Sequence, residues 1–170
     1  GEAMKRAWIR TVSTLLCKEG LGMTNGTCAM TAVGALACYD TICAAEMADV
    51  IASMSFEGLT GLRSAFDPRI HQYRGHKGQI LAAENMRLLL EGSEILDHCQ
   101  EDRVQDAYAL RCIPQVHGAV RDALQYVIEK VNIELNAVTD NPLLFTEDES
   151  VVSGGNFHGE PMALPFALLG

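Results

Sequence analysis

Three polar side chains recur at intervals of three residues in the second half of the chain: Gln105, Tyr108 and Arg111. On a helix, steps of three turn each side chain by about 60° from the one before, so the three would lie along one face. That face would present a neutral amide, a titratable hydroxyl and a guanidinium that can hold a carboxylate through two hydrogen bonds. Such a set suits a small substrate with a carboxylate and a group to be protonated or deprotonated. The same residue types also share ordinary solvated helix faces, so the spacing alone leaves both interpretations open.

The segment around these residues resembles the Gln-Asp-x-Tyr-Ser-x-Arg-Cys block of histidine ammonia-lyases, within the aromatic amino acid ammonia-lyase family. Six further segments resemble blocks of that family and occur in the family's order: residues 18–27, 66–71, 74–79, 114–119, 140–143 and 153–158. Together the blocks cover essentially the whole chain. The resemblance implies an all-α fold, a bundle of long helices of the ammonia-lyase and fumarase type. Residues 1–170 would form a single domain, the central helical part of a longer chain.

Members of this family carry a methylidene-imidazolone ring, an electrophile made by cyclisation of an internal Ala-Ser-Gly. This sequence contains no Ala-Ser-Gly, since Ser153-Gly154 follows Val152 and belongs to a different block. The resemblance places the ring-forming residues before Gly1. The chain begins without a methionine and ends in an apolar run, residues 163–169. We therefore expect an internal fragment of a longer polypeptide that is inactive by itself.

The resemblance assigns roles to five positions, carried over one at a time. Asn25 matches an asparagine near the ring and the substrate, and Gln105 matches a glutamine beside the ring. Tyr108 matches a tyrosine that handles a proton or shapes the surroundings of the ring. Arg111 matches the clamp on the substrate carboxylate, a role that suits a planar guanidinium better than an ammonium. Phe157 matches an aromatic residue that packs over the reacting region, so Asn25, Gln105 and Phe157 are also the expected cofactor-binding residues.

The substrate implied by the resemblance is L-histidine, because residues 112–119 look more like histidine than phenylalanine lyases. A tyrosine or phenylalanine ammonia-lyase or an aminomutase of the same family is the alternative. Cys28 and Ala107 depart from the glutamine and proline of many members and leave the fine geometry open. A rival of another class is a non-catalytic helical oligomerisation core. A fumarase-type lyase would need a Gly-Ser-Ser-x-Met-Pro loop, which this sequence lacks.

Composition narrows the class of protein and its partners. Hydrophobic residues make up 48% of the chain but aromatic residues only 6%, so the core is mostly aliphatic, which favours helices packed on helices. The formal net charge of −9 argues against a nucleic-acid or anionic-membrane partner, since both bind basic surfaces. We therefore expect no nucleic-acid or membrane partner, while the small amino acid substrate is what the resemblance implies.

Cysteine and histidine spacings give no metal site. None of the six cysteines forms a Cys-x-x-Cys pair, and three of the six lie in an alanine-rich apolar run. The six are Cys17, Cys28, Cys38, Cys43, Cys99 and Cys112. We expect free, buried thiols in a reducing cytosol and hence a cytoplasmic protein. Residues 56–78 read as an irregular segment rich in glycine. Its His71 and His76, five apart, fit neither one helix face nor a common metal spacing, so structural hydrogen bonds are expected.

The elements that must position these residues are mostly helices. Apolar periodicity predicts an amphipathic helix over residues 2–17, and three glycines predict a loop over residues 18–26. The almost wholly apolar or small residues of the stretch 27–55 predict one long helix that is apolar on all sides. Its length would span a bilayer, but its acidic residues disfavour that reading: Asp40, Glu46 and Asp49. Burial at the centre of a homo-oligomer, a homotetramer by the resemblance, is the expectation.

After residue 78, the sequence pattern predicts two more long helices, one small sheet and a last short helix. Helices are expected over residues 79–91 and 114–138, the second started by Pro114 and stopped by Asp140-Asn141-Pro142. The long helices at 27–55 and 114–138 should pack parallel or antiparallel. Apolar residues on both sides of an acidic tip predict a short β-hairpin within residues 143–153. A last helix should start near Pro161.

Overall fold

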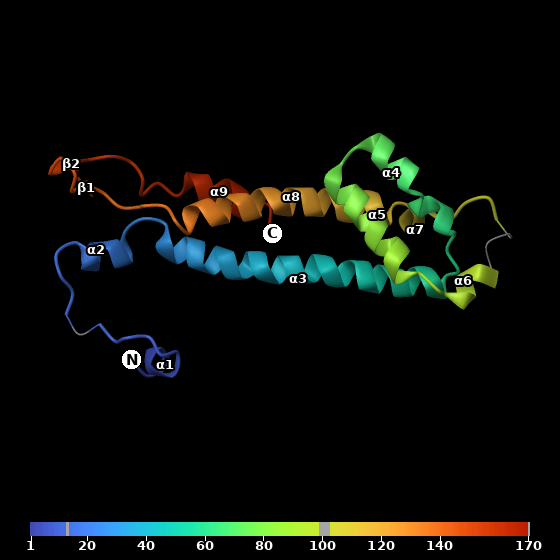
Figure 1. Cartoon of the computed structure of the whole chain (residues 1–170), viewed down its shortest axis with the longest axis horizontal. Helices are drawn as coiled ribbons and strands as arrows, with labels where there is room; N and C mark the ends of the chain where they lie inside the picture. The colour runs from blue at the N-terminus through green and yellow to red at the C-terminus, as the bar shows by residue number, and fades with distance from the viewer. Residues whose placement is uncertain (13, 99–102, 170) are drawn as a thin grey trace.

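The computed structural model describes residues 1–12, 14–98 and 103–169. Two long antiparallel helices form its axis, α3 (Cys28–Gly58) and α8 (Ile113–Glu134) (Figure 1). The α3 sequence is rich in alanine and lacks proline, and it ends at Gly58, where the helix propensity is lost. Pro114 lies in the first turn of α8, where its missing N–H costs nothing. The predicted all-α fold and antiparallel pair of long helices are confirmed.

A third helix, α5 (Lys77–Leu89), crosses the pair and packs tightly on α8 (Figure 1). Two glycines make the close approach possible. A Cβ atom added to Gly118 would lie 2.3 Å from the backbone nitrogen of Gln79, and one added to Gly78 would lie 2.2 Å from the Gly118 carbonyl oxygen. Backbone therefore meets backbone at this crossing, which only residues without a side chain allow. The helix predicted over residues 79–91 is confirmed.

Two apolar cores hold the helices together. The first lies where the end of α3 meets α5 and consists of Phe56, Phe66, Met86, Leu90, Leu96 and Ile113. The second lies between the middle of α3, α8 and the last helix, α9 (Glu160–Ala167), and consists of Cys38, Leu124, Val127, Val131 and Met162. The predicted last helix near Pro161 is confirmed.

A buried acid joins the three main helices between these cores. The Asp49 carboxylate on α3, whose side chain is 2% exposed, accepts hydrogen bonds from His117 Nδ1 at 2.7 Å and Arg121 Nη2 at 2.5 Å on α8. Asn85 Nδ2 on α5 donates a third at 2.7 Å. Burial alone would raise the pKa of Asp49, but the Asn85 and His117 hydrogen bonds and the Arg121 charge hold it below its usual value. Asp49 is therefore ionised and fully partnered.

The remaining elements are short. They are η1 (Arg63–Phe66), α4 (Pro68–Arg74), α6 (Glu94–His98), α7 (Tyr108–Arg111), β1 (Leu143–Phe145) and β2 (Ser150–Val152). β1 and β2 form the predicted antiparallel hairpin, with Leu143 opposite Val152. The expectation that residues 56–78 are irregular is wrong in part, because η1 and α4 lie there. Asp67 caps α4 by accepting the backbone N–H of Arg69 at 2.9 Å, which the sequence pattern did not indicate.

The first 26 residues differ from the prediction. The helix expected over residues 2–17 stops early, as α1 (Glu2–Arg6), and the expected loop contains a helix, α2 (Glu19–Thr24). Trp8 has a positive φ of 58° and is 97% exposed. An amphipathic helix is stabilised mainly by packing of its apolar face, and no residue of α1 is buried.

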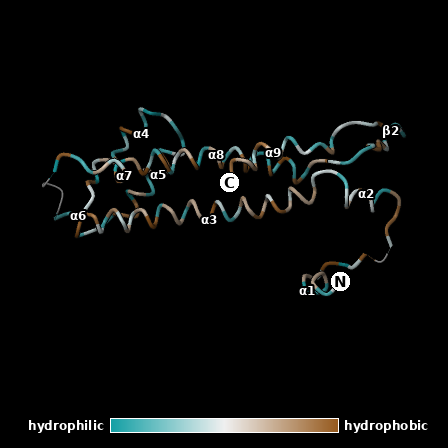
Figure 2. Tube along the Cα trace, turned by 180° about the vertical axis from the view of Figure 1, so that it is seen from behind, coloured by the Kyte–Doolittle hydropathy of each residue, from teal (hydrophilic) through white to brown (hydrophobic). Residues whose placement is uncertain are grey.

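Much of helix α3 is solvent-exposed in a single chain, so the expected burial of residues 27–55 at the centre of a homo-oligomer stays a prediction. Large apolar side chains on it are solvent-exposed: Val33, Leu36, Tyr39, Met47, Ile51 and Met54. Figure 2 shows apolar residues along its whole length. Length and composition alone would also allow α3 to cross a membrane. Its polar contacts to α5 and α8 through Asp49 are instead those of a helix packed in a bundle.

The thiols and His71 complete the fold. The cysteines within the described ranges are free, as predicted, but Cys17, Cys28 and Cys43 are exposed rather than buried. Cys99 lies outside the described residues. His71 is buried and makes two structural hydrogen bonds, one with the Ala65 carbonyl and one with the Gln79 amide. Its predicted structural role is confirmed.

Candidate functional site

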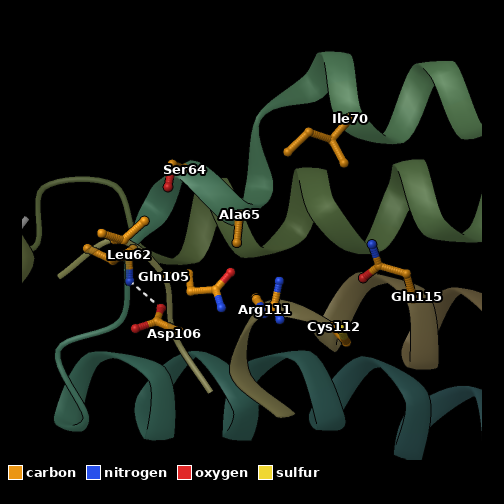
Figure 3. A pocket seen from close by; sticks show the side chains of 10 residues that line it. Leu62, Ser64, Ala65, Ile70, Gln105, Asp106, Arg111, Cys112 and Gln115 are labelled. Atoms are coloured by element: carbon orange, nitrogen blue, oxygen red, sulfur yellow. Dashed lines mark hydrogen bonds between the residues drawn. The ribbon is translucent and has the colours of Figure 1, made fainter. Parts of the chain in front are cut away.

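A pocket of about 300 Å³ lies beside Arg111, between the segment after α3 and the start of α8 (Figure 3). Its wall consists of Leu62, Ser64, Ala65, Ile70, Val104, Gln105, Asp106, Arg111, Cys112 and Gln115. The Gln105 amide is directed toward Arg111 in this view. The pocket therefore combines an apolar side with a guanidinium and two amides, a composition that can orient a small polar ligand.

Arg111 is free to bind a ligand. Within the part of the chain that the structure describes, its Nε atom is buried and has no hydrogen-bond partner. A buried unpaired donor is costly, so a site that keeps one has a use for it. The guanidinium is always charged and offers two parallel N–H groups, which match a carboxylate. This geometry supports the carboxylate clamp expected from the sequence.

The expected helical face of Gln105, Tyr108 and Arg111 is wrong in one respect. Helix α7 begins only at Tyr108, so Gln105 precedes it and reaches the pocket from an extended segment. Asp106 fixes that segment, since its carboxylate accepts the Leu62 backbone N–H at 2.6 Å and pairs with Arg103 at 3.1 Å. Tyr108 lies outside the pocket wall and is 75% exposed. The structure thus brings Gln105 and Arg111 together and leaves the Tyr108 phenol facing solvent.

Asn25 belongs to a second polar group at the other end of α3. Its Nδ2 donates to Asp140 at 3.1 Å, and Lys18 pairs with the same carboxylate at 2.8 Å. The Lys18 ammonium also donates to the Pro142 carbonyl. Asn25 follows α2 and precedes α3, so this junction ties the start of the long helix to the loop after α8. Because Nδ2 is the donor of this hydrogen bond, the Asn25 side-chain oxygen remains available to accept another.

Phe157 lies at the Asn25 end, in the segment between β2 and α9. The neighbouring Asn156 amide donates to the Val138 carbonyl at 3.2 Å, and Ser153 donates to the Asn141 side chain at 3.1 Å. These bonds hold the Phe157 segment against the loop that carries Asp140. Phe157 itself is 44% exposed. Its aromatic face is therefore open to a ligand or to a second chain.

The five predicted site residues thus form two groups, one at each end of α3 (Figure 1). Asn25 and Phe157 are at the α2 end, and Gln105, Tyr108 and Arg111 are at the α7 end. Helix α3 has 31 residues and at 1.5 Å per residue is about 45 Å long. In one copy of the chain the two groups are therefore too far apart to contact the same small ligand.

The acid at the Asn25 end gives a testable titration. The Lys18 and Asn25 side chains and the Asn141 backbone lower the pKa of Asp140 to about 2. The junction should therefore be intact above pH ~4, the ordinary value for an aspartate, and should be lost as the pH falls through about 2. We expect the carbon-detected NMR titration of Asp140 to show that low midpoint. Lys18→Met should move the midpoint upward, and an unchanged midpoint would contradict the role given to Lys18.

Sequence reasoning missed the two carboxylates that position these groups, Asp106 and Asp140. Asp106 lies beside Gln105 and Asp140 lies in the segment 140–143. Their partners are distant in the sequence, so residue spacing did not indicate these contacts. Among the residues that the structure describes, no group of three histidine, cysteine or acidic side chains is arranged to hold a metal ion.

Comparison with known proteins places this geometry in a family. The model of the family described as aromatic amino acid lyase matches residues 1–169. The chain is 56% identical to a histidine ammonia-lyase of Alkaliphilus oremlandii and 53% identical to histidine ammonia-lyase 1 of Fusobacterium nucleatum, over 99% of its length in both cases. It spans about a third of each of these relatives (33%).

Solved structures agree with the sequence comparison. The fold is similar to that of a histidine ammonia-lyase from Trypanosoma cruzi, with a TM-score of 0.76 and 39% identity. A tyrosine aminomutase from Streptomyces globisporus is also similar, with a TM-score of 0.84 and 36% identity. Both likenesses cover 99% of this chain, and 32% and 35% of the two known chains.

Proposed function

The chain belongs to the aromatic amino acid lyase family, and from this premise we propose that the full-length protein is a histidine ammonia-lyase. The reaction would be the elimination of ammonia from L-histidine to give urocanate, a step of histidine catabolism in the cytoplasm. The observation that carries the proposal is the buried Arg111 Nε in its pocket, which has no hydrogen-bond partner among the described residues. The higher identity to histidine ammonia-lyases than to the tyrosine aminomutase supports histidine as the substrate.

Each site residue then has a role that its position permits. Arg111 would hold the substrate carboxylate, and Gln105 beside it would bind the edge of the methylidene-imidazolone ring. Asn25 and Phe157 would line the opposite side of the ring, Asn25 through its free oxygen. The ring, made from an Ala-Ser-Gly that this sequence does not contain, would supply an electrophile. Tyr108, whose hydroxyl faces outward from α7, would move a proton to or from a group brought by another copy.

This arrangement requires a homo-oligomer, and we propose the homotetramer that the family resemblance implies. The exposed apolar side chains of α3 support it, because uncovered patches of this kind usually mark an interface. Antiparallel contact between the α3 helices of two copies would bring an Asn25 end to an Arg111 end. The substrate would then bind between subunits.

Assembly can be measured directly. We expect sedimentation of the protein at micromolar concentration to show an oligomer, because the α3 face is uncovered in one chain. Leu36→Glu, at a position 70% exposed in the single chain, should dissociate it without disturbing the core. A well-behaved monomer for the unaltered protein would contradict the proposed assembly.

Turnover tests the reaction itself. We expect the full-length protein to produce urocanate from L-histidine, followed by its near-ultraviolet absorbance, and residues 1–170 alone to produce none, because the electrophile is not in this sequence. L-tyrosine and L-phenylalanine, offered in parallel, test the alternative of another lyase or an aminomutase. Formation of urocanate by the fragment alone would contradict the assigned need for the ring.

A further inference from the structure

A second buried polar atom, in Gln115, lies in the wall of the Arg111 pocket and has no assigned role. Gln115 is in the first turn of α8, four residues beyond Arg111, and its amide lies on the other side of Arg111 from Gln105 (Figure 3). Its Oε1 atom is buried and, within the described ranges, has no hydrogen-bond partner. Buried amide oxygens are nearly always satisfied, so this one calls for a donor that the chain itself does not provide.

Asp106 Oδ1 in the pocket wall also lacks a hydrogen bond but forms an ion pair with Arg103, which leaves two buried atoms of the wall with opposite needs. Arg111 Nε is a donor without an acceptor, and Gln115 Oε1 is an acceptor without a donor. A ligand that satisfies both must carry an acceptor and a donor close together. An α-amino acid does so, because its carboxylate and ammonium groups share one carbon atom. We propose that Gln115 is a substrate-binding residue whose side-chain oxygen accepts a hydrogen bond from the α-ammonium group while Arg111 holds the carboxylate.

This inference rests on the proposed function, because it assumes an amino acid substrate in this pocket. The role of Gln115 adds a source of substrate specificity to that proposed function. Arg111 alone would accept any small carboxylate of suitable size. With Gln115, a ligand that lacks the ammonium group leaves a buried acceptor unpaired and is disfavoured, which is how a polar site rejects an analogue missing one hydrogen-bonding group. The deaminated product has lost the ammonium group, so the pocket would bind the product more weakly than the substrate and release it more readily.

The test uses two inert probes that each keep one of the two groups. Histamine has the ammonium group without the carboxylate, and imidazolylpropionate has the carboxylate without the ammonium group. Their dissociation constants would be measured by calorimetry in the full-length protein. Gln115→Met, which keeps the length of the side chain, should weaken histamine about tenfold or more and leave imidazolylpropionate unchanged. Arg111→Ala should give the reverse pattern.

Stability separates this role from a structural one. Because Gln115 Oε1 has no partner in the described structure, Gln115→Met removes an unsatisfied polar group and should leave the urea midpoint unchanged or higher. Gln125→Met, the same change on an exposed part of α8, is the matched control and should alter neither binding nor stability. Weaker binding together with an undiminished midpoint is the expected result.

Three outcomes would overturn the inference. They are equal histamine binding in Gln115→Met and the unaltered protein, a loss of imidazolylpropionate binding instead, and a lowered urea midpoint. These outcomes are independent of turnover. If the unaltered protein binds the probes as expected but makes no urocanate from L-histidine, the proposed reaction fails and the assignment of Gln115 stands. If it makes urocanate but Gln115→Met binds histamine as tightly as the unaltered protein does, the assignment of Gln115 fails and the proposed reaction stands.

Discussion

Arg111→Ala in the full-length protein is expected to lower kcat/KM for L-histidine by the equivalent of ~2–5 kcal/mol, because a charge-assisted carboxylate contact is broken from one side. The Arg111 guanidinium lies in the pocket wall, and its buried Nε has no hydrogen-bond partner among the described residues. Without it, the substrate carboxylate would enter a largely apolar pocket with no compensating charge. Initial rates of urocanate formation over a range of L-histidine concentrations give the measurement.

Two comparison variants make the result specific. Arg111→Lys keeps the positive charge but loses the planar pair of N–H groups, so it should fall between the alanine variant and the unaltered protein. Arg74→Ala removes an exposed guanidinium at the end of α4, outside the wall of the Arg111 pocket, and should change kcat/KM little. An unchanged kcat/KM for Arg111→Ala would refute the clamp.

Asp49→Ala is expected to lower the free energy of unfolding by ~3–5 kcal/mol, because it leaves the buried Arg121 charge without its partner. The Asp49 carboxylate also accepts hydrogen bonds from Asn85 and His117, and three helices would lose their shared contact. Urea unfolding followed by circular dichroism measures the loss. Asp40→Ala, on an exposed position of the same helix, should change stability by no more than ~0.5 kcal/mol.

Acid should reproduce part of this effect in the unaltered protein. The pKa of Asp49 is lower in the folded chain than its usual value, so its contribution is fully present above the unfolded pKa of ~3.9 and is lost as the pH falls through the folded pKa. The urea midpoint should therefore fall with decreasing pH below about 4. In Asp49→Ala that part of the slope should be absent, and an equal slope in both proteins would contradict the assignment.

The elements predicted well are those whose cause is local. Helix α3 follows from a long run without proline, α8 has Pro114 in its first turn, and the hairpin follows from two short apolar segments around an acidic tip. The failures lie where packing decides. Residues 7–12 have helical periodicity, but nothing in the described part of the chain covers their apolar face, and Trp8 is left exposed. The cysteines of α3 were expected inside because of their apolar neighbours, yet Cys43 faces outward.

For the site, the sequence indicated residue types and roles but not their placement. The step of three suggested a helix from Gln105 onward, whereas a hydrogen bond between Asp106 and Leu62, 44 residues apart, holds that segment extended. Gln115 carried no signal, because its importance comes from a missing partner rather than from a motif. The length of α3 follows from its sequence, but no local pattern showed that Asn25 and Arg111 lie at opposite ends of this helix.

The rigid 45 Å spacing set by α3 has a genetic consequence. If every site takes its two halves from different copies, a defect at Asn25 and a defect at Arg111 are faults in different halves. Two strains, each producing one of these inactive proteins, would lack activity separately. When both chains are made in one cell, some mixed oligomers pair a sound Asn25 end with a sound Arg111 end. The proposed assembly therefore predicts intragenic complementation, in which a single chain carrying both defects could not take part.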